Sequence, residues 1–235
     1  MAKIVNPDVD IDLEEVKGDG ATAVEEKGAV LEFVEKNGKM LLIGGVLLTL
    51  LVVGYLYWNG IKDGNNVKGQ AAMFQAEYYF QQDSLAKALN GDGKAKGFLA
   101  VEKEFSGTKV GNLSKYYIGQ IYLRQGKTAE GIKYLENFDK GNNLPSVMAY
   151  ASLASANEDL GKMAEAAALF EKAAGVTSEK DDQLKPYFMV RAGLAYEDAG
   201  KKDKAAELYK QVKEKYSKSQ EAQSIDKYLG RVSND

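Results

Sequence analysis

The chain contains no cysteine and no histidine among its 235 residues. This absence excludes Cys–His dyads, Ser–His–Asp triads and the usual zinc ligand sets, because each of them needs one or both residue types. The lack of cysteine is compatible with an oxidising compartment, although many cytosolic proteins also lack this residue. We therefore expect no enzymatic activity, no metal site and no cofactor.

Proline is also scarce, with only three residues in the chain. Pro145 and Pro186 fall between predicted helical segments, where a missing N–H and a fixed φ do least harm. The run from Asn90 to Lys94 lacks the spacing and the hydroxyl of a phosphate-binding loop, so it predicts a solvated turn. No basic stripe indicates a nucleic-acid partner. The composition favours an all-α protein that works through binding.

A single uncharged, apolar run extends over nineteen residues, from Met40 to Trp58. As a helix it reaches about 28 Å, close to the hydrocarbon thickness of a bilayer. Thirty-nine residues precede it, ten of them acidic, which does not fit a cleavable signal peptide. We predict an uncleaved transmembrane helix over 40–58, the alternative being the buried helix of a soluble core. The predicted membrane-interface residues are Lys36, Lys39, Tyr55, Tyr57 and Trp58.

Lysines near the two ends of this run indicate its orientation. Lys27, Lys36 and Lys39 precede it, whereas Lys62 and Lys68 follow it. The excess on the N-terminal side favours a cytoplasmic N-terminus and a periplasmic C-terminal domain, in a single-pass protein of the inner membrane. A bias of three to two leaves the reverse topology open, with the C-terminal domain in the cytoplasm.

The segment before the apolar run divides into two predicted parts. Residues 1–23 are rich in acidic and small residues, which predicts a disordered tail. Residues 24–39 carry Val30, Leu31 and Val34 at helical spacing, which predicts a juxtamembrane amphipathic helix. Asn37 and Gly38 indicate that this helix stops just before the bilayer.

Residues 59–235 contain a repeated pattern built on three glycines. Gly126, Gly161 and Gly200 each end a predicted helix and are spaced by 35 and 39 residues. Small residues stand seven before and five after each of them, and mostly large residues stand four before and nine after. The small residues are Gly119, Ala154, Gly193, Gly131, Ala166 and Ala205; the others are Tyr122, Asn157, Tyr196, Leu135, Phe170 and Tyr209.

This pattern resembles the tetratricopeptide repeat, a 34-residue helix pair in which small residues face large ones. The resemblance predicts a solenoid of about three repeats, with a longer loop at 177–182. A further degenerate unit fits upstream, with helices over 67–89 and 94–105 and with Ala76 and Tyr79 in the small and aromatic positions. Residues 219–229 are apolar on one face only, which predicts a terminal capping helix.

In such arrays the first helix of each pair lines a concave groove, mainly through four positions of the repeat. Much of the groove mapped in this way is apolar, and it lacks the Lys and Asn of carboxylate-clamp repeats. It suits an amphipathic helix or an unfolded hydrophobic segment, unless these residues pack against neighbouring repeats. The predicted partner-binding residues are Met73, Phe80, Leu113, Tyr116, Gln120, Leu123, Met148, Tyr187, Val190 and Leu194.

The whole arrangement is similar to YfgM-type proteins. The likeness rests on a short tail, on Phe33 with Asn37-Gly38-Lys39 before a single anchor, on Tyr57-Trp58-Asn59 at its end, and on tetratricopeptide repeats beyond it. The resemblance implies an ancillary subunit of the SecYEG translocon that works with the PpiD chaperone on exported polypeptides, and it carries over no catalytic residue. The alternative function is a scaffold for another cell-envelope assembly complex.

Overall fold

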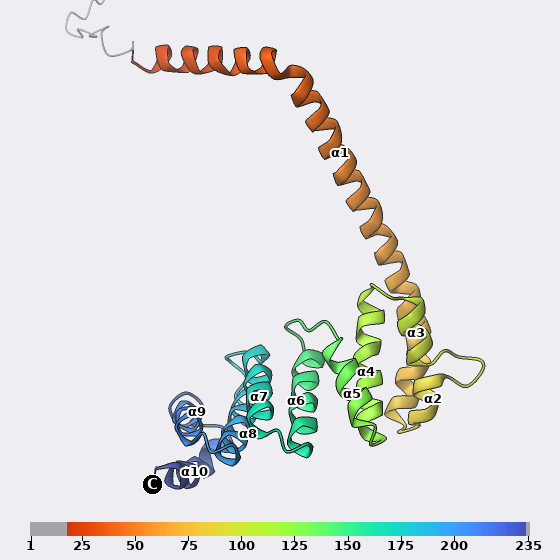
Figure 1. Ribbon diagram of the computed structural model, residues 1–235, viewed down its shortest axis with the longest axis vertical. Helices are drawn as coiled ribbons and strands as arrows, with labels where there is room; N and C mark the ends of the chain where they lie inside the picture. The colour runs from red at the N-terminus through yellow and green to blue at the C-terminus, as the bar shows by residue number, and fades with distance from the viewer. Residues whose placement is uncertain (1–17, 234–235) are drawn as a thin grey trace, which may run out of the picture. The chain divides into compact units, whose positions relative to one another are not determined.

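The computed structural model describes residues 18–233, which are helical apart from turns, loops and a bridge between Gly91 and Lys96 (Figure 1). The prediction of an all-α fold is confirmed for this part of the chain. Helix α1 extends over Gly18–Gln81. The chain divides into two compact units, one that ends at Gly60 and one that begins at Ile61.

In the first unit, α1 is long and apolar enough to cross a membrane. The five predicted interface residues are all exposed, and so are the aliphatic side chains between them. Thr49 donates its hydroxyl hydrogen to the carbonyl of Gly45, 2.8 Å away, so this polar side chain is satisfied within the helix. A span over 40–58 remains a prediction that the exposed apolar surface supports.

The predicted helix end at Asn37 and Gly38 is wrong, because α1 continues through both residues. The Asn37 amide donates to the carbonyl of Phe33, 2.9 Å away, and so bonds along the helix instead of terminating it. Residues 24–39 and 40–58 therefore belong to one helix. Of the tail predicted over 1–23, residues 1–17 lie outside the described residues, and the helix already includes residues 18–23.

The second unit consists of helices that pack in chain order, mainly as antiparallel pairs (Figure 1). Pro145 and Pro186 lie in the first turns of α6 and α8, where a helix needs no N–H from them. The helices are α2 (Leu85–Asn90), α3 (Phe98–Glu104), α4 (Lys109–Arg124), α5 (Thr128–Glu136), α6 (Leu144–Asp159), α7 (Met163–Val176), α8 (Leu184–Asp198), α9 (Lys202–Lys215), η1 (Glu221–Ser224) and α10 (Ile225–Val232).

The three turn glycines close α4, α6 and α8 as predicted. Gly126, Gly161 and Gly200 have φ angles of 74°, 73° and 72°, in the left-handed region that suits glycine. In the degenerate repeat that precedes the other three, the residue that corresponds to these glycines is Asp83, with φ of 52°. The helix predicted over 67–89 is therefore divided into the end of α1, at Gln81, and α2. The helix predicted over 94–105 is the shorter α3, Phe98–Glu104.

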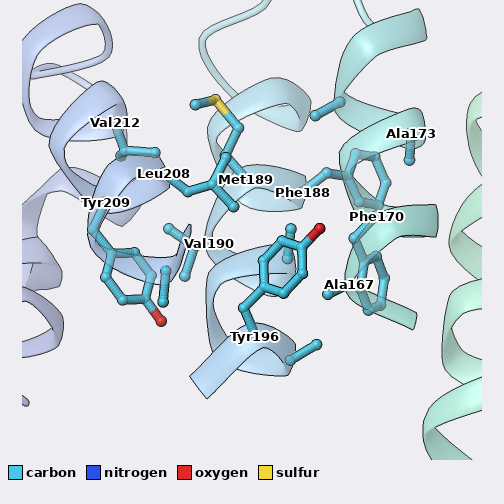
Figure 2. Close-up of a cluster of buried hydrophobic side chains, with 14 of the residues drawn as sticks. Ala167, Phe170, Ala173, Phe188, Met189, Val190, Tyr196, Leu208, Tyr209 and Val212 are labelled. Atoms are coloured by element: carbon cyan, nitrogen blue, oxygen red, sulfur yellow. The ribbon is translucent and has the colours of Figure 1, made fainter. Parts of the chain in front are cut away.

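Small residues meet large ones within each pair, also as predicted. A Cβ at Gly119 would lie 2.6 Å from Cγ of Leu135, and one at Gly193 would lie 2.7 Å from Cζ of Tyr209. Such close approach lets the two helices of a pair bury their large side chains. Figure 2 shows the resulting cluster between α7, α8 and α9, which includes Phe170, Phe188, Met189, Val190, Tyr196, Leu208 and Tyr209.

The C-terminal end of the solenoid carries the predicted cap at slightly different bounds. The segment predicted over 219–229 forms η1 and then α10, which ends at Val232. Ile225 is buried, and the ring of Tyr228 stacks on Tyr209 with centroids 5.4 Å apart. The last repeat is therefore shielded from solvent by the end of the chain.

Candidate functional site

A hollow of about 270 Å³ lies on the face formed by the first helices of three successive repeats. α6 supplies most of its wall, and α4, α7 and α8 complete it. Most of the α6 residues in this lining are alanine or serine, whose small side chains leave space between the larger ones. The lining residues are Leu123, Met148, Ala151, Ser152, Ser155, Ala156, Asp159, Phe170, Tyr187, Phe188 and Arg191.

Arg191 holds one side of the hollow in place. Its Nη2 donates to Oε2 of Glu158 on α6, 2.6 Å away, and its guanidinium lies 4.6 Å from the ring centroid of Phe170 on α7. Both members of the ion pair are partly buried. One side chain of α8 thus binds an acid and an aromatic ring of the preceding repeat, which fixes the spacing of the three helices.

Tyr187 stands beside Arg191 on the same helix and is 41% exposed. Its ring meets that of Phe188 edge-on, with centroids 5.1 Å apart, and its hydroxyl accepts a hydrogen bond from Arg191 Nη1 at 3.4 Å. Met148 on α6 adds a flexible apolar side chain to the same hollow. An apolar lining with a few fixed polar groups can bind a peptide side chain or a helix face.

The structure brings together three of the ten residues predicted for the groove. Leu123, Met148 and Tyr187 all line the hollow. Met73 and Val190 are only 4% and 7% exposed and belong to core clusters, so they do not line the open surface. The same position of the repeat therefore lines the open surface in some repeats and is buried in others.

The other five predicted residues are partly buried and lie outside the hollow. Gln120 uses its amide to donate to the hydroxyl of Ser152 at 2.7 Å, which joins α4 to α6. Tyr116 packs against Phe138, and its burial raises the pKa of its phenol above the ordinary value. Phe80, Leu113 and Leu194 pack against the core clusters. These five residues therefore pack against neighbouring helices, which is the alternative to lining the groove.

Arg191, Ser152 and Asp159 belong to the hollow and were not predicted. Arg191 and Ser152 occupy the sixth position of the repeat, which the mapping of groove positions does not include. The sequence did carry one signal, since Arg191 follows Tyr187 by four residues and therefore shares its helix face. Its partners Glu158 and Phe170 come from another repeat, so their approach could not be read from the local sequence.

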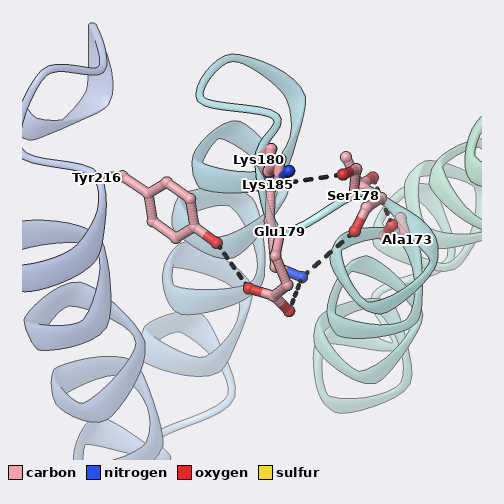
Figure 3. A network of polar contacts seen from close by, with 7 residues as sticks. Ala173, Ser178, Glu179, Lys180, Lys185 and Tyr216 are labelled. Atoms are coloured by element: carbon pink, nitrogen blue, oxygen red, sulfur yellow. Dashed lines mark hydrogen bonds and ion pairs between the residues drawn. The ribbon is translucent and has the colours of Figure 1, made fainter.

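A second cluster of polar contacts fixes the long loop between α7 and α8 (Figure 3). Lys185, which is mostly buried, donates to Oε1 of Glu179 at 2.6 Å and to the carbonyl of Thr177 at 3.3 Å. The hydroxyl of Tyr216 donates to the other carboxylate oxygen of Glu179 at 3.1 Å. Hydrogen bonding to Lys185 lowers the pKa of Glu179. These contacts connect the predicted loop at 177–182 to α8 and to the end of α9.

The chemistry of the hollow is that of a binding surface. Its polar groups are hydroxyls, one ion pair and the exposed Asp159, and none of them is a nucleophile with an adjacent base. Among the side chains that the structure describes, those of residues 33–233, no group of three or more acidic residues is placed to hold a metal ion. Shape and apolar contact are what this site offers to a ligand.

Comparison with known proteins agrees with this architecture. Residues 116–181 and 187–219 each match the tetratricopeptide repeat family. No match was found among the curated proteins. Tetratricopeptide repeats are typically non-catalytic scaffolds for protein partners, and no enzyme family is indicated.

Two solved structures share this fold. One is a Podosopora anserina protein described as a kinesin light chain with nearly identical TPR-like repeats, at 17% identity and a TM-score of 0.51, covering 69% of this chain and 84% of the other. A point variant of that protein gives a TM-score of 0.50 at the same identity and coverage. The MamA protein aligns at 17% identity with a TM-score of 0.45, covering 70% and 89%. Residues 116–181 and 187–219 thus carry tetratricopeptide repeats, and the second unit has the fold of a tetratricopeptide-type helical solenoid.

Proposed function

We propose that the protein is a non-enzymatic, membrane-anchored scaffold of the Sec protein-export machinery. In this role, the apolar stretch of α1 crosses the inner membrane once and the repeats lie in the periplasm. The repeats bind a PpiD-like chaperone beside the SecYEG translocon and meet exported polypeptides there. The anchor supports the location, and the similarity to YfgM-type proteins supports the choice of machinery.

The observation that carries the binding role is the hollow between α4, α6 and α8. It presents Leu123, Met148 and Tyr187 from three successive repeats, together with small residues of α6. An amphipathic helix of a chaperone, or a hydrophobic segment of an emerging chain, matches such a surface. A membrane tether raises the effective concentration of both kinds of partner, so binding need not be tight.

Site-specific photo-crosslinking in living cells tests this proposal. A photoreactive residue at Tyr187 or Ser155 lies in the hollow, and the same group at the exposed Lys210 of α9 is the control. We expect capture of a translocon subunit or of the chaperone from the hollow and not from Lys210. Capture of neither would contradict the proposal. Enrichment of a different stable envelope complex would favour the alternative scaffold role.

Protease protection in intact spheroplasts tests the topology separately. A periplasmic repeat unit is degraded by added protease without lysis, whereas a cytoplasmic one survives until the membrane is broken. Survival of the repeats in intact spheroplasts would overturn the proposed orientation.

A further inference from the structure

The part of α1 in the second unit has an exposed apolar face. Val67 is 68% exposed, Phe74 is 70% exposed and Tyr78 is 49% exposed, and Ala71 between them is exposed too. These residues follow one another at steps of four, three and four, so they form one stripe along the helix. We call this stripe the α1 face.

The opposite side of the same helix packs on the solenoid. A Cβ at Gly69 would lie 3.1 Å from Cγ of Phe105 and 3.2 Å from the side chain of Val110. Met73 accepts a hydrogen bond from the hydroxyl of Ser114, and Ala76 is fully buried. The two sides of α1 are therefore distinct, and the exposure of the α1 face does not come from a poorly packed helix.

In the inner repeats, most residues equivalent to the α1 face are covered by the preceding repeat, whereas Ser152 and Arg191, at the position of Phe74, also line the hollow. Tyr117, which corresponds to Phe74, stacks on Phe98 of α3 with centroids 4.6 Å apart. Arg191, at the same position two repeats later, lies over Phe170 of α7. The equivalents of Ala71 and Tyr78 are at most 3% exposed: Ser114, Ala149, Phe188, Ile121, Ala156 and Ala195.

The α1 face thus corresponds to the surface that, in later repeats, packs against the preceding repeat. At the other end of the solenoid, α10 covers the last repeat through Ile225 and Tyr228. Terminal repeats usually have a polar outer side, because an apolar one favours association. Two aromatic rings on the outer side of the first repeat therefore indicate an interaction surface.

The spacing and charge of this face fit a second copy of the same helix. Apolar or small residues at steps of three and four give a heptad seam, in which Gly64, Val67, Ala71, Phe74 and Tyr78 occupy the a and d positions. Asp63 and Lys68 flank this seam at g and e positions, and both are exposed. In a parallel pair, a g residue meets the e residue five positions later in the partner chain.

Charge complementarity is what selects this occupant. Residues five apart lie on different sides of their own helix, so Asp63 and Lys68 are not i,i+4 partners within one chain. Across a parallel two-fold pair they meet twice, with opposite charges each time. Gln70 and Gln75 are related in the same way and match as amides. An antiparallel pair would not bring these particular residues together.

We propose that the α1 face binds the α1 face of a second copy, as a short parallel coiled coil at the N-terminal end of the solenoid. The pairing leaves the hollow between α4, α6 and α8 free, because its lining comes from later helices. If α1 anchors the protein as proposed above, one membrane holds both copies in the parallel orientation. The association itself does not depend on the identity of the partner in the hollow.

Single cysteines test the geometry, since the natural chain has none. In full-length protein in its native membrane, we expect Ala71→Cys and Phe74→Cys to form disulfide-linked dimers on mild oxidation. Asn65→Cys, exposed on the same helix but away from the seam, is the matched control and should crosslink at least fivefold less. Equal crosslinking at all three positions would overturn the proposed geometry.

Charge exchange tests the identity of the occupant. Asp63→Lys and Lys68→Asp each place like charges opposite one another, and we expect each to weaken self-association of the detergent-solubilised full chain about threefold to tenfold. The double variant restores the opposite charges and should return to within about twofold of the parent. A monomeric parent, or a double variant no better than the singles, would contradict pairing between copies.

Phe74→Lys provides a variant that should not affect folding, because the side chain is exposed. We expect it to abolish dimers while the helical circular dichroism and the Tm stay unchanged. Leu160→Lys removes a comparably exposed apolar residue from the end of α6 and should remain dimeric. If both variants lose dimers alike, the effect comes from added charge and the α1 face is not the interface.

Discussion

Gly193 of α8 lies directly against the ring of Tyr209 of α9, where any Cβ would come within 2.7 Å of Cζ. The ring cannot move away, because Tyr209 is fully buried and its hydroxyl donates to Glu197 at 2.5 Å. Burial raises the pKa of this phenol, so it remains a donor at any physiological pH. The glycine is required for packing here, since the helix itself would favour alanine.

Gly193→Ala should therefore destabilise the repeats. Overpacking costs about 1–3 kcal/mol, and the better helix propensity of alanine offsets up to about 1 kcal/mol of that. The net loss corresponds to a fall in Tm of a few degrees, measured by circular dichroism at 222 nm. Gly175→Ala in α7 is the matched control, because nothing lies within 4 Å of its Cβ position. That control should leave the Tm unchanged or raise it slightly.

The turn glycines respond to substitution for a different reason. At Gly161 a Cβ would meet nothing within 4 Å, but φ is 73°. Gly161→Ala should cost about 1–2 kcal/mol, because L-residues are strained in the left-handed region. Gly161→Asn should cost clearly less, since asparagine tolerates this conformation. Chemical denaturation of the two variants checks the order, and equal losses would point to an effect other than backbone strain.

Asp83 offers the reverse test. It holds φ of 52° at the turn of the first helix pair, where the other repeats have glycine. Asp83→Gly should stabilise this pair by a few tenths of a kcal/mol, because the strain of a left-handed non-glycine residue is relieved. The weak, exposed contact of Asp83 with Arg124 at 3.4 Å gives little to lose. A lower Tm in this variant would contradict the argument.

The local features of the fold were predictable because they depend on short-range rules. A glycine after a helical pattern indicates a left-handed cap, and small residues opposite large ones indicate a close helix pair. The first prediction is confirmed at Gly126, Gly161 and Gly200, and the second at Gly119 and Gly193. The end predicted at Asn37 failed because an asparagine can also bond to the preceding turn of a continuing helix, as it does to Phe33.

The site was less predictable because it is built from residues of different repeats. Val190 is buried because α9 and the end of the chain pack close to α8, a distance that no local pattern encodes. Arg191 reaches the hollow through its contacts with Glu158 and Phe170, which lie 33 and 21 residues earlier in the chain. Three of the predicted residues, Leu123, Met148 and Tyr187, line the hollow, and long-range packing determined which other residues of their helices do so.

Asp92 gives the solenoid a contribution to stability that depends on pH. Its carboxylate accepts hydrogen bonds from the backbone N–H groups of Ala95 and Lys94 and from the hydroxyl of Tyr79, and these lower its pKa to about 2. The unfolded carboxylate has a pKa of about 3.9. The stabilisation is therefore fully present above about pH 4 and is lost as the pH falls towards 2.

Carboxyl ¹³C NMR titration measures this pKa directly. In Tyr79→Phe, the pKa of Asp92 should rise but stay below 3.9, because the backbone donors remain. The difference in Tm between the parent and Asp92→Asn should shrink between pH 4 and pH 2. A difference that is independent of pH over this range would show that the charge of Asp92 does not stabilise the turn.

The last prediction concerns Arg191 at the edge of the hollow. Arg191→Lys keeps the positive charge but loses the planar group that binds Glu158 at 2.6 Å while it stacks on Phe170. We expect a loss of about 0.5–1 kcal/mol in stability, measured by chemical denaturation. A double-mutant cycle of Glu158→Gln and Arg191→Met should give a coupling of about 0.5–1 kcal/mol, because both side chains are partly exposed.

Salt separates the two contributions of this arginine. The coupling with Glu158 should weaken as ionic strength rises, whereas the packing on Phe170 should not. A coupling of zero together with an unchanged Arg191→Lys would show that Arg191 does not fix the wall of the hollow. If the wall depends on it, Arg191→Lys should also reduce crosslinking from a photoreactive residue at position 187, since that position shares the helix face of Arg191. Weaker crosslinking in Arg191→Lys would show that the partner recognises the shape of this surface, because the substitution leaves the net charge unchanged.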